Sequence, residues 1–316
     1  MKSERPGAQV WEKLGRVYCA AGEDPWRTSH AYLPTACVLS ADTIRVFVAF
    51  LDDAGMGRVG YVDVDALNPT TVIGVSERPC LDLGRPGTFD EHGVSPLCLA
   101  RVGPLLYLYY AGWQRSASVR YFLFTGLAKS GDDGVNFVRV SEAPILDRCD
   151  GELLVRTGGF VFSHRDRWIF AYMGGSQQME VAGKATPTYD LMTLSSKSPI
   201  AWAGRGSLSL SPNRPTEFGF GRPWVISEHG SCHMWLSVRT AARGYELSYA
   251  ESADGVSWLR RDDALRFVGP QDAWDSETKS FASVVDTRGG RFMFYNGNGY
   301  GATGFGVARL LDGDGN

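Results

Sequence analysis

An ionisable side chain stands 16 residues before four of five short apolar, aromatic runs in this sequence. The runs begin at Val46, Leu106, Trp168, His233 and Phe292, and the residues 16 positions before them are His30, Asp90, Glu152, Glu217 and Ser276. Ser276 is itself flanked by Asp275 and Glu277. Because only 21% of the chain is charged, this clustering predicts that these side chains occupy one place in a repeated structure. The prediction depends on register, since a slip of one residue turns a strand side chain to the other face.

Positively charged residues lie close to the same positions: Arg27, Arg156, Arg222 and Lys279. Two kinds of chemistry suit such a group. In one, a carboxylic acid protonates the leaving oxygen of a glycoside while a carboxylate activates water or attacks the anomeric carbon. In the other, charge-assisted hydrogen bonds hold a polar or phosphorylated ligand. A third interpretation needs no ligand, because carboxylates and arginines could simply pair across a channel and seal it.

The elements that position these residues form a repeat. The five apolar runs begin 59 to 65 residues apart, and a second series precedes each by about ten residues, at Thr35, Pro96, Gly159, Pro223 and Ala282. Turn residues such as "SADT", "RVGP" and "TRGG" separate the two runs of each pair, which predicts a β-hairpin. A further strand followed by an Asp-Gly turn recurs in "AKSGDDGVNF" and "AESADGVSW".

Each repeat therefore has three or four antiparallel strands over about 60 residues, the pattern of a propeller blade. We expect an all-β, five-bladed β-propeller that forms a single domain over residues 1–316. The predicted blades are 27–85, 86–148, 149–212, 213–272 and 273–316, with N-terminal residues helping to close the ring. A two-sheet sandwich is the alternative, but it gives no reason for five repeats. In a propeller, the first strand of each blade lines the central channel, so residues that enter it converge at one face.

Composition excludes several classes of function. The net charge of -3 provides no basic field for nucleic acid. The N-terminal residues hold no apolar run long enough for a signal peptide, and no segment approaches the roughly 20 apolar residues of a membrane span. We therefore expect a cytoplasmic protein with no membrane or nucleic-acid partner.

The six cysteines show no metal-binding spacing such as CxxC. Most lie in apolar runs, which favours reduced thiols in the core. No cofactor and no metal ligands are predicted, although the channel leaves room for a structural cation.

Several longer motifs carry a family resemblance. "SHAYLPTACVL", "GTFDEHGVSPLCLARVGPLLYLYYAGW", "GRPWVI", "YAESADGVSWLRRDD", "WDSETKSFASVV" and "FMFYNGNGYGATGFGVA" resemble bacterial five-bladed propeller proteins that are similar to glycoside hydrolase families 43, 32, 62 and 130. The similarity covers essentially the whole chain. It implies a protein that processes sugars, and glycosidases of this architecture use an aspartate base, an aspartate that tunes pKa, and a glutamate acid.

Three motifs match that pattern in this sequence. Asp90 stands in "FDxxGVxP", Glu217 and Arg222 stand in "ExxxxRP", and Asp275 and Glu277 stand in "WDSE". The resemblance implies Glu217 as the general acid and Asp90 as a base or orienting carboxylate, with Glu277 as a further catalytic carboxylate. Where related enzymes have a blade 1 aspartate, this chain offers Asp24 and His30.

The remaining candidates would bind a small sugar-containing substrate. They are Arg27, His30, His92, Glu152, Arg156, Arg222, Trp274, Asp275 and Lys279, and aromatic residues that could stack on sugar rings or pack between blades are Trp26, Trp113, Trp224, Trp274, Tyr295 and Tyr300. Hydrolysis of a glycosidic bond is the leading function. The alternatives are a non-hydrolytic step such as phosphorolysis, transfer, cyclisation or elimination, and saccharide binding without turnover.

Overall fold

The computed structural model describes residues 8–22, 24–181 and 183–311, and the regular elements of this part of the chain are almost all strands. Every predicted hairpin is present. The first and second strands pair antiparallel in each case, as β2 with β3, β6 with β7, β10 with β11, β14 with β15 and β19 with β20. The alternation of buried apolar runs with short turns therefore predicted local structure correctly.

The strands follow one another in antiparallel groups. The first comprises β2 (Ser29–Val38), β3 (Thr43–Leu51), β4 (Gly57–Asp65) and β5 (Val72–Val75); the second β6 (Val94–Val102), β7 (Leu105–Arg115), β8 (Tyr121–Ser130) and β9 (Val138–Arg139). The third comprises β10 (Val155–His164), β11 (Arg167–Val181), β12 (Lys184–Ser196) and β13 (Ser207–Leu210); the fourth β14 (Glu217–Glu228), β15 (Ser231–Thr240), β16 (Gly244–Ser252) and β17 (Leu259–Arg260). A short parallel pairing of β8 with β10 joins the second and third groups into one sheet.

The last group joins the two ends of the chain. It contains β19 (Ser280–Thr287), β20 (Gly290–Asn296), β21 (Phe305–Leu310), the N-terminal strand β1 (Gln9–Tyr18) and the parallel strand β18 (Leu265–Val268). Strand β1 pairs antiparallel with β21. Between these strands lie the short turns η1 (Asp262–Ala264) and η2 (Ala273–Asp275) and the one-turn helix α1 (Asn298–Gly301). The first and last parts of the described chain thus share one sheet.

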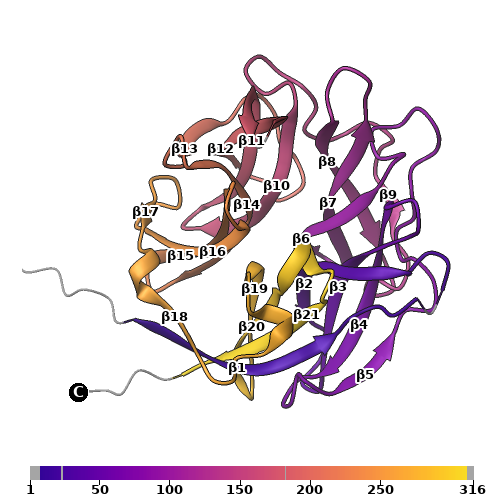
Figure 1. Cartoon of the computed structure of the whole chain (residues 1–316), viewed down its shortest axis with the longest axis vertical. Helices are drawn as coiled ribbons and strands as arrows, with labels where there is room; N and C mark the ends of the chain where they lie inside the picture. Colours follow the sequence, from indigo (N-terminus) through magenta and orange to yellow (C-terminus); the bar gives the residue numbers. More distant parts are fainter. Residues whose placement is uncertain (1–7, 23, 182, 312–316) are drawn as a thin grey trace, which may run out of the picture.

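The groups surround a common centre, as Figure 1 shows. Their first strands contact one another in turn, β2 against β6, β6 against β10, β10 against β14, β14 against β19 and β19 against β2. The register of each first strand shifts near this centre, at Tyr32/Thr35, Pro96/Cys98, Thr157/Phe160, Gly221/Trp224 and Ser280/Ser283. Such bulges bend a strand and re-aim side chains, and here they occur where five strands meet.

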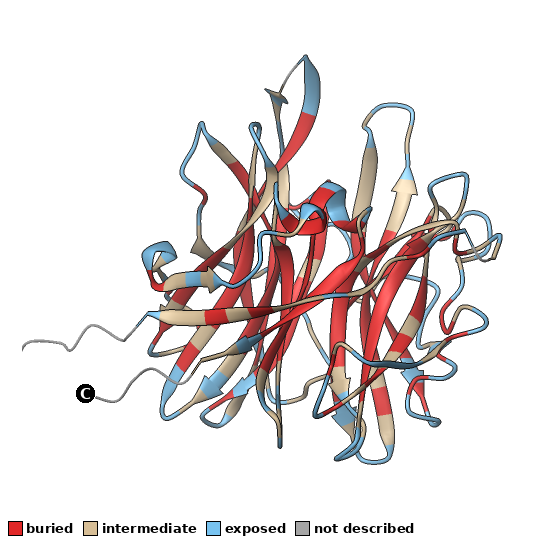
Figure 2. Ribbon diagram, turned by 60° about the horizontal axis from the view of Figure 1, so that its bottom comes forward, coloured by how far each residue is buried: buried red, intermediate tan, exposed pale blue. Residues whose placement is uncertain are grey.

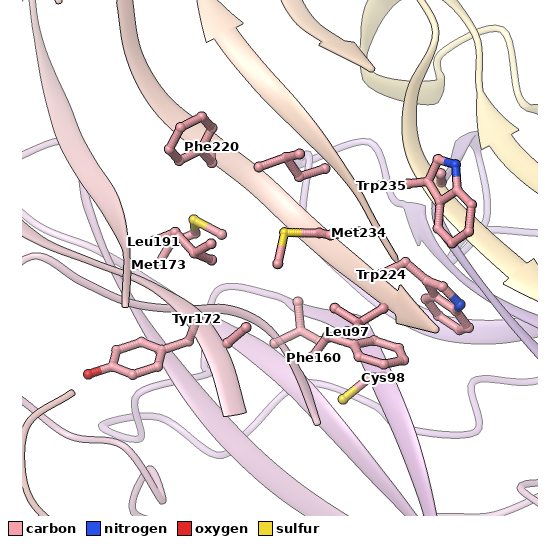
Figure 3. Close-up of a cluster of buried hydrophobic side chains, with 14 of the residues drawn as sticks. Leu97, Cys98, Phe160, Tyr172, Met173, Leu191, Phe220, Trp224, Met234 and Trp235 are labelled. Carbon is pink, nitrogen blue, oxygen red and sulfur yellow. The ribbon is translucent and has the colours of Figure 1, made fainter. Parts of the chain in front are cut away.

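Buried residues occupy much of the length of the strands (Figure 2), and the hydrophobic ones among them form the core. Figure 3 shows one part of it, in which Phe160 packs against Trp224 with ring centroids 4.6 Å apart, near Cys98 and Met234. Cys80, Cys98 and Cys232 are buried, and all six cysteines carry free thiols. No helix within the described ranges has both the length and the apolar character needed to cross a membrane.

Candidate functional site

A cavity of about 840 Å³ opens where the five first strands meet. Each register shift supplies one lining residue to it: Leu33, Leu97, Gly158, Arg222 and Phe281. The backbone is unusual at this place, because the non-glycine residues His30, Leu33, Phe281 and Tyr300 all line the cavity with positive φ angles. Such strained residues collect at functional sites. The geometry therefore marks this cavity as the candidate site.

Arg222 is the charged member of the five register-shift residues, and it lies in the middle of the fold with 2% of its surface exposed. Its guanidinium donates hydrogen bonds to the Thr35 hydroxyl (2.7 Å) and to the carbonyls of Leu97 (3.4 Å), Phe281 (2.6 Å) and Ala282 (2.8 Å). Bulges leave backbone groups without ladder partners, so this arginine stabilises three neighbouring groups of strands at once. Burial lowers the pKa of Arg222 to about 9, and the Cys98 thiol opposes that shift.

Arg239 forms a second cationic part of the wall with two tyrosines. Its guanidinium donates to the Tyr189 hydroxyl at 3.2 Å, and that hydroxyl also bonds to the hydroxyl of Tyr245. The Arg239 guanidinium lies 5.0 Å from the Phe218 ring and 5.6 Å from the Tyr245 ring. Burial raises the pKa of Tyr189 to about 12. Both tyrosines are therefore neutral hydrogen-bonding groups at ordinary pH.

Arg115 and Arg120 lie at the exposed edge of the cavity. Arg115 is the cross-strand partner of Tyr121 and donates to the Ala54 carbonyl at 2.9 Å. Trp113 on the same strand donates from its indole nitrogen to the Ser95 hydroxyl at 3.1 Å. Aromatic rings with fixed orientation beside exposed guanidinium groups suit stacking against a ligand combined with hydrogen bonding.

Two histidines line the cavity. His30 is half-buried, its Nδ1 lies 3.0 Å from the Ser29 hydroxyl, and burial lowers its pKa below the ordinary value of 6.5. His92 accepts a hydrogen bond from the Arg115 backbone N–H at 3.4 Å and lies 3.6 Å from the Glu91 carboxylate.

The predicted catalytic carboxylates do not line this cavity, and no aspartate or glutamate within the described residues does. Asp90 is fully buried instead, where it accepts hydrogen bonds from Arg139 (2.7 Å), Thr88 (2.9 Å) and Tyr110 (3.1 Å). Every one of these partners donates to Asp90, so its carboxylate is enclosed in a hydrogen-bonded cluster of protein groups.

The carboxylates of the third and last groups have the same surroundings. Glu152 pairs with Arg156 at 2.6 Å and accepts from the Tyr172 hydroxyl. Asp275, which has no exposed surface, pairs with Lys13 at 3.1 Å and accepts from the Tyr295 hydroxyl.

We call these the three carboxylate clusters, and in each the tyrosine follows the carboxylate by 20 residues: Asp90–Tyr110–Arg139, Glu152–Tyr172–Arg156 and Asp275–Tyr295–Lys13. Burial, followed by the charge of the adjacent carboxylate, raises the pKa of each tyrosine. The tyrosines therefore stay protonated and remain donors to the carboxylates.

Neither Glu217 nor Glu277 lines the cavity. Glu217 begins β14 and pairs with Arg260 at 2.7 Å. Glu277 is exposed, and its backbone N–H donates to the Asn298 side chain. None of the three predicted catalytic carboxylates, Asp90, Glu217 and Glu277, therefore lines this cavity.

The predicted binding residues divide in the same way. His30, His92 and Arg222 line the cavity. The others lie in the surrounding structure: Arg27 pairs with Asp24, Arg156 with Glu152 and Lys279 with Asp275, while Trp274 packs against Tyr295. Among the aromatic candidates, Trp113 and Tyr300 line the cavity, and Trp224 packs in the core.

Sequence reasoning missed Arg115, Tyr121, Tyr189, Arg239 and Tyr245. The sequence holds a signal for four of them. Arg115 precedes Tyr121 by six residues, and Arg239 precedes Tyr245 by the same number. Each pair spans a hairpin turn, and its two residues are direct cross-strand partners. Two repeats thus place an arginine and a tyrosine beside the same hairpin turn, where both line the cavity. The 16-residue spacing did not reveal them, because it follows the first strands.

No group of three or more metal-ligating side chains lies close enough together to hold an ion within the ranges that the structure describes. The cavity donors are guanidinium, imidazole and phenol groups, and arginine is not a metal ligand.

Three solved structures that are similar to this chain come from glycoside-processing proteins. A glycosyl hydrolase from Bacteroides ovatus aligns with a TM-score of 0.71 and 14% identity over 98% of both chains. A member of the GH130 family of mannoside phosphorylases aligns with a TM-score of 0.68 and 14% identity over 98% of both chains. A thermostable family-43 glycoside hydrolase aligns with a TM-score of 0.65 and 14% identity over 90% of this chain and 91% of its own. The chain therefore has the propeller fold of the glycoside hydrolases.

The sequence also places the chain in a narrower group. It is 31% identical over 305 residues to the uncharacterized protein Rv1502 of Mycobacterium tuberculosis. The alignment covers 95% of this chain and 99% of that protein. The chain belongs to the family of Rv1502. No model of a known protein family matches the sequence.

Proposed function

We propose that the protein is a sugar-processing enzyme whose substrate lies in the central cavity and whose proton transfers come from cavity side chains other than carboxylates. The observation that carries this proposal is the make-up of the cavity wall. Aromatic rings and nitrogen donors line it, while no carboxylate from the described residues does. Clefts with apolar walls and a few converging polar groups are typical ligand sites.

The proposal includes a five-bladed ring. Each antiparallel group of strands would be one blade, so that the blades follow the predicted limits 27–85, 86–148, 149–212, 213–272 and 273–316 within one domain. The cyclic contacts of β2, β6, β10, β14 and β19 support this count, as does the pairing of β1 with β21.

A non-hydrolytic reaction fits this site better than hydrolysis by a carboxylate pair. Such hydrolysis needs two carboxyl groups about 5–10 Å apart on either side of the bond. Asp90 is enclosed by three donors, and Glu277 is exposed elsewhere. His30, which burial keeps neutral at pH 7, is the candidate base for a transfer, phosphorolysis, cyclisation or elimination.

Turnover assays on matched variants test the proposal. Wild-type protein is incubated with aryl glycosides, nucleoside glycosides and sugar phosphates, with and without inorganic phosphate, and products are followed by NMR. We expect His30→Asn and Trp113→Ala to abolish or strongly reduce turnover, and Glu277→Gln to retain it. Turnover that survives in both cavity variants and disappears in Glu277→Gln would refute the assignment of the site.

Saccharide binding without catalysis is the second candidate, because none of the described residues brings a carboxylate to the cavity wall. In that case calorimetry would detect a bound sugar that Trp113→Ala weakens, while NMR would show no product under any condition. This result would leave the site in place and remove the enzymatic step.

A further inference from the structure

The arginines of the cavity differ from the other buried arginines in their partners. Within the described residues, four arginines are buried, and three of them face a carboxylate: Arg27 faces Asp24, Arg45 faces Asp63 and Arg156 faces Glu152. Arg222, the fourth, bonds to a hydroxyl and three carbonyls and forms no ion pair. A buried charge without a counter-ion is costly, which suggests that a ligand supplies the missing anion.

Three more guanidinium groups on the cavity wall also have no carboxylate partner among the described residues. Arg239, Arg115 and Arg120 line the cavity, and none of them forms an ion pair with a carboxylate of the described residues. The exposure increases from Arg222 at 2%, through half-buried Arg239, to the exposed Arg115 and Arg120. The positive charge therefore continues from the floor of the cavity to its mouth, in a protein whose net charge is -3.

Contacts connect the two inner arginines. Tyr245 lies 5.6 Å from the Arg239 guanidinium, its ring centroid lies 5.0 Å from that of Phe281, and the Phe281 carbonyl accepts a hydrogen bond from Arg222. The two residues also stand on paired strands, β14 and β15. Arg239 donates to Tyr189, so its guanidinium group and the hydroxyls of Tyr189 and Tyr245 border the same space.

We propose that the cavity ligand carries a phosphate group, which contacts Arg239 and the Tyr189 and Tyr245 hydroxyls above the uncompensated charge of Arg222. This inference rests on the proposed function, because the phosphate would be either an ester on the sugar or a free inorganic phosphate beside it. Phosphate suits the donors: guanidinium groups bind it through two parallel N–H bonds, and its remaining oxygens can accept from the tyrosines. The exposed arginines would attract the anion toward the cavity.

Calorimetry on the full chain tests the proposal with defined probes. The ligands are glucose 1-phosphate, mannose 1-phosphate, inorganic phosphate, the neutral sugars glucose and mannose, and each neutral sugar together with inorganic phosphate. Tighter binding of a sugar phosphate than of the mixture indicates an ester on the sugar, and mutual enhancement of neutral sugar and phosphate indicates free phosphate. Affinity for the phosphate-bearing probe should fall with added salt.

Variants assign the effect to the cavity. We expect Arg239→Met to weaken phosphate binding roughly ten- to a hundredfold, the loss typical of a charged hydrogen bond, and Arg239→Lys to restore part of it. Arg85→Met is the matched control, since Arg85 is exposed and pairs with Glu142 outside the cavity; its affinity should stay within about twofold of the wild type. Thermal unfolding of each variant confirms that it is folded.

The outcomes separate this inference from the proposed function. Neutral sugars that bind as tightly as their phosphates, with no effect of Arg239→Met, would overturn the phosphate site and leave the sugar site standing. A second contrary outcome is that Arg85→Met and Arg239→Met weaken phosphate binding equally. That result would show general attraction to surface charge rather than a site in the cavity, and would also overturn the phosphate proposal. If neither phosphates nor sugars bind, both proposals fail.

Discussion

The three carboxylate clusters and the central cavity both contain cations and tyrosines, but they differ in whether a carboxylate balances the positive charge. In each cluster a buried carboxylate meets a tyrosine hydroxyl and a cation, so the charge is balanced within the protein. In the cavity, arginines and tyrosines meet without a carboxylate from the described residues. The comparison teaches that a charged residue in a repeated position can stabilise the fold, and that an unbalanced charge is the better indicator of a ligand site.

Loss of the cation from a carboxylate cluster should have the largest effect. Arg156→Met removes the near ion-pair partner of Glu152, of which 1% is exposed, and leaves only the exposed Arg205 at 3.6 Å. Breaking a buried pair in this way costs about 3–5 kcal/mol. Urea unfolding should show a large drop in the transition midpoint, while calorimetry should show little change in ligand affinity of the folded fraction. A stable variant that has lost its ligand would contradict the structural role of the cluster.

Asp90→Asn should have an intermediate effect. The amide keeps one acceptor oxygen but directs an NH₂ group at a donor, since Thr88, Tyr110 and Arg139 all donate to Asp90. An unsatisfied buried group of this kind costs about 1–3 kcal/mol. We expect a lower melting temperature with ligand binding and turnover retained. If turnover disappears while the melting temperature is unchanged, Asp90 is a catalytic base after all.

His30 in the cavity should make a smaller, pH-dependent contribution to the stability of the fold. Burial lowers the pKa of His30 below 6.5, so the unfolded chain binds more protons between the folded and unfolded pKa values. The stability contributed by neutral His30 is complete above about pH 6.5 and is lost as the pH falls through the folded pKa. Denaturant unfolding at pH 7 and pH 5 should show a smaller loss on acidification in His30→Asn than in the wild type.

Protonation of His30 should also tighten phosphate binding in the wild type as the pH falls, because it adds a positive charge to the cavity wall. His30→Asn should show less of this tightening over the range in which the charge of the phosphate itself is constant. Equal pH dependence in the two proteins would mean that His30 does not face the bound anion.

Glu277→Gln should have the smallest effect. The side chain is exposed and lies outside the cavity lining, and surface substitutions of this kind change stability by less than about 0.5 kcal/mol. Both the melting temperature and the ligand affinity should match those of the wild type. A large loss of turnover would place this carboxylate in the reaction and would weaken the contrast between the two regions.

Much of the fold was predictable because its signals are local. Runs such as "LYLYY" and "FMFYN", separated by turn residues from the preceding strands, predict hairpins from period and turn chemistry alone, and β7 and β20 contain them. The 16-residue spacing holds in two of the three clusters, those of Asp90 and Glu152. In the last repeat the equivalent carboxylate is Asp275, which stands 17 residues before Phe292. The spacing identified a structural position common to the repeats, which sequence alone could not distinguish from a catalytic one.

The sequence by itself therefore determined the strands, their pairing in hairpins and the repeat, because neighbouring residues make those interactions. Only the tertiary structure decided which charges stay unbalanced. Arg222 meets Thr35, Leu97 and Phe281 from three other strands, and Asp90 meets Arg139, which is 49 residues away. Whether a carboxylate is neutralised or an arginine is left without one depends on these distant partners, and the closing of the sheets around a common centre brings them together.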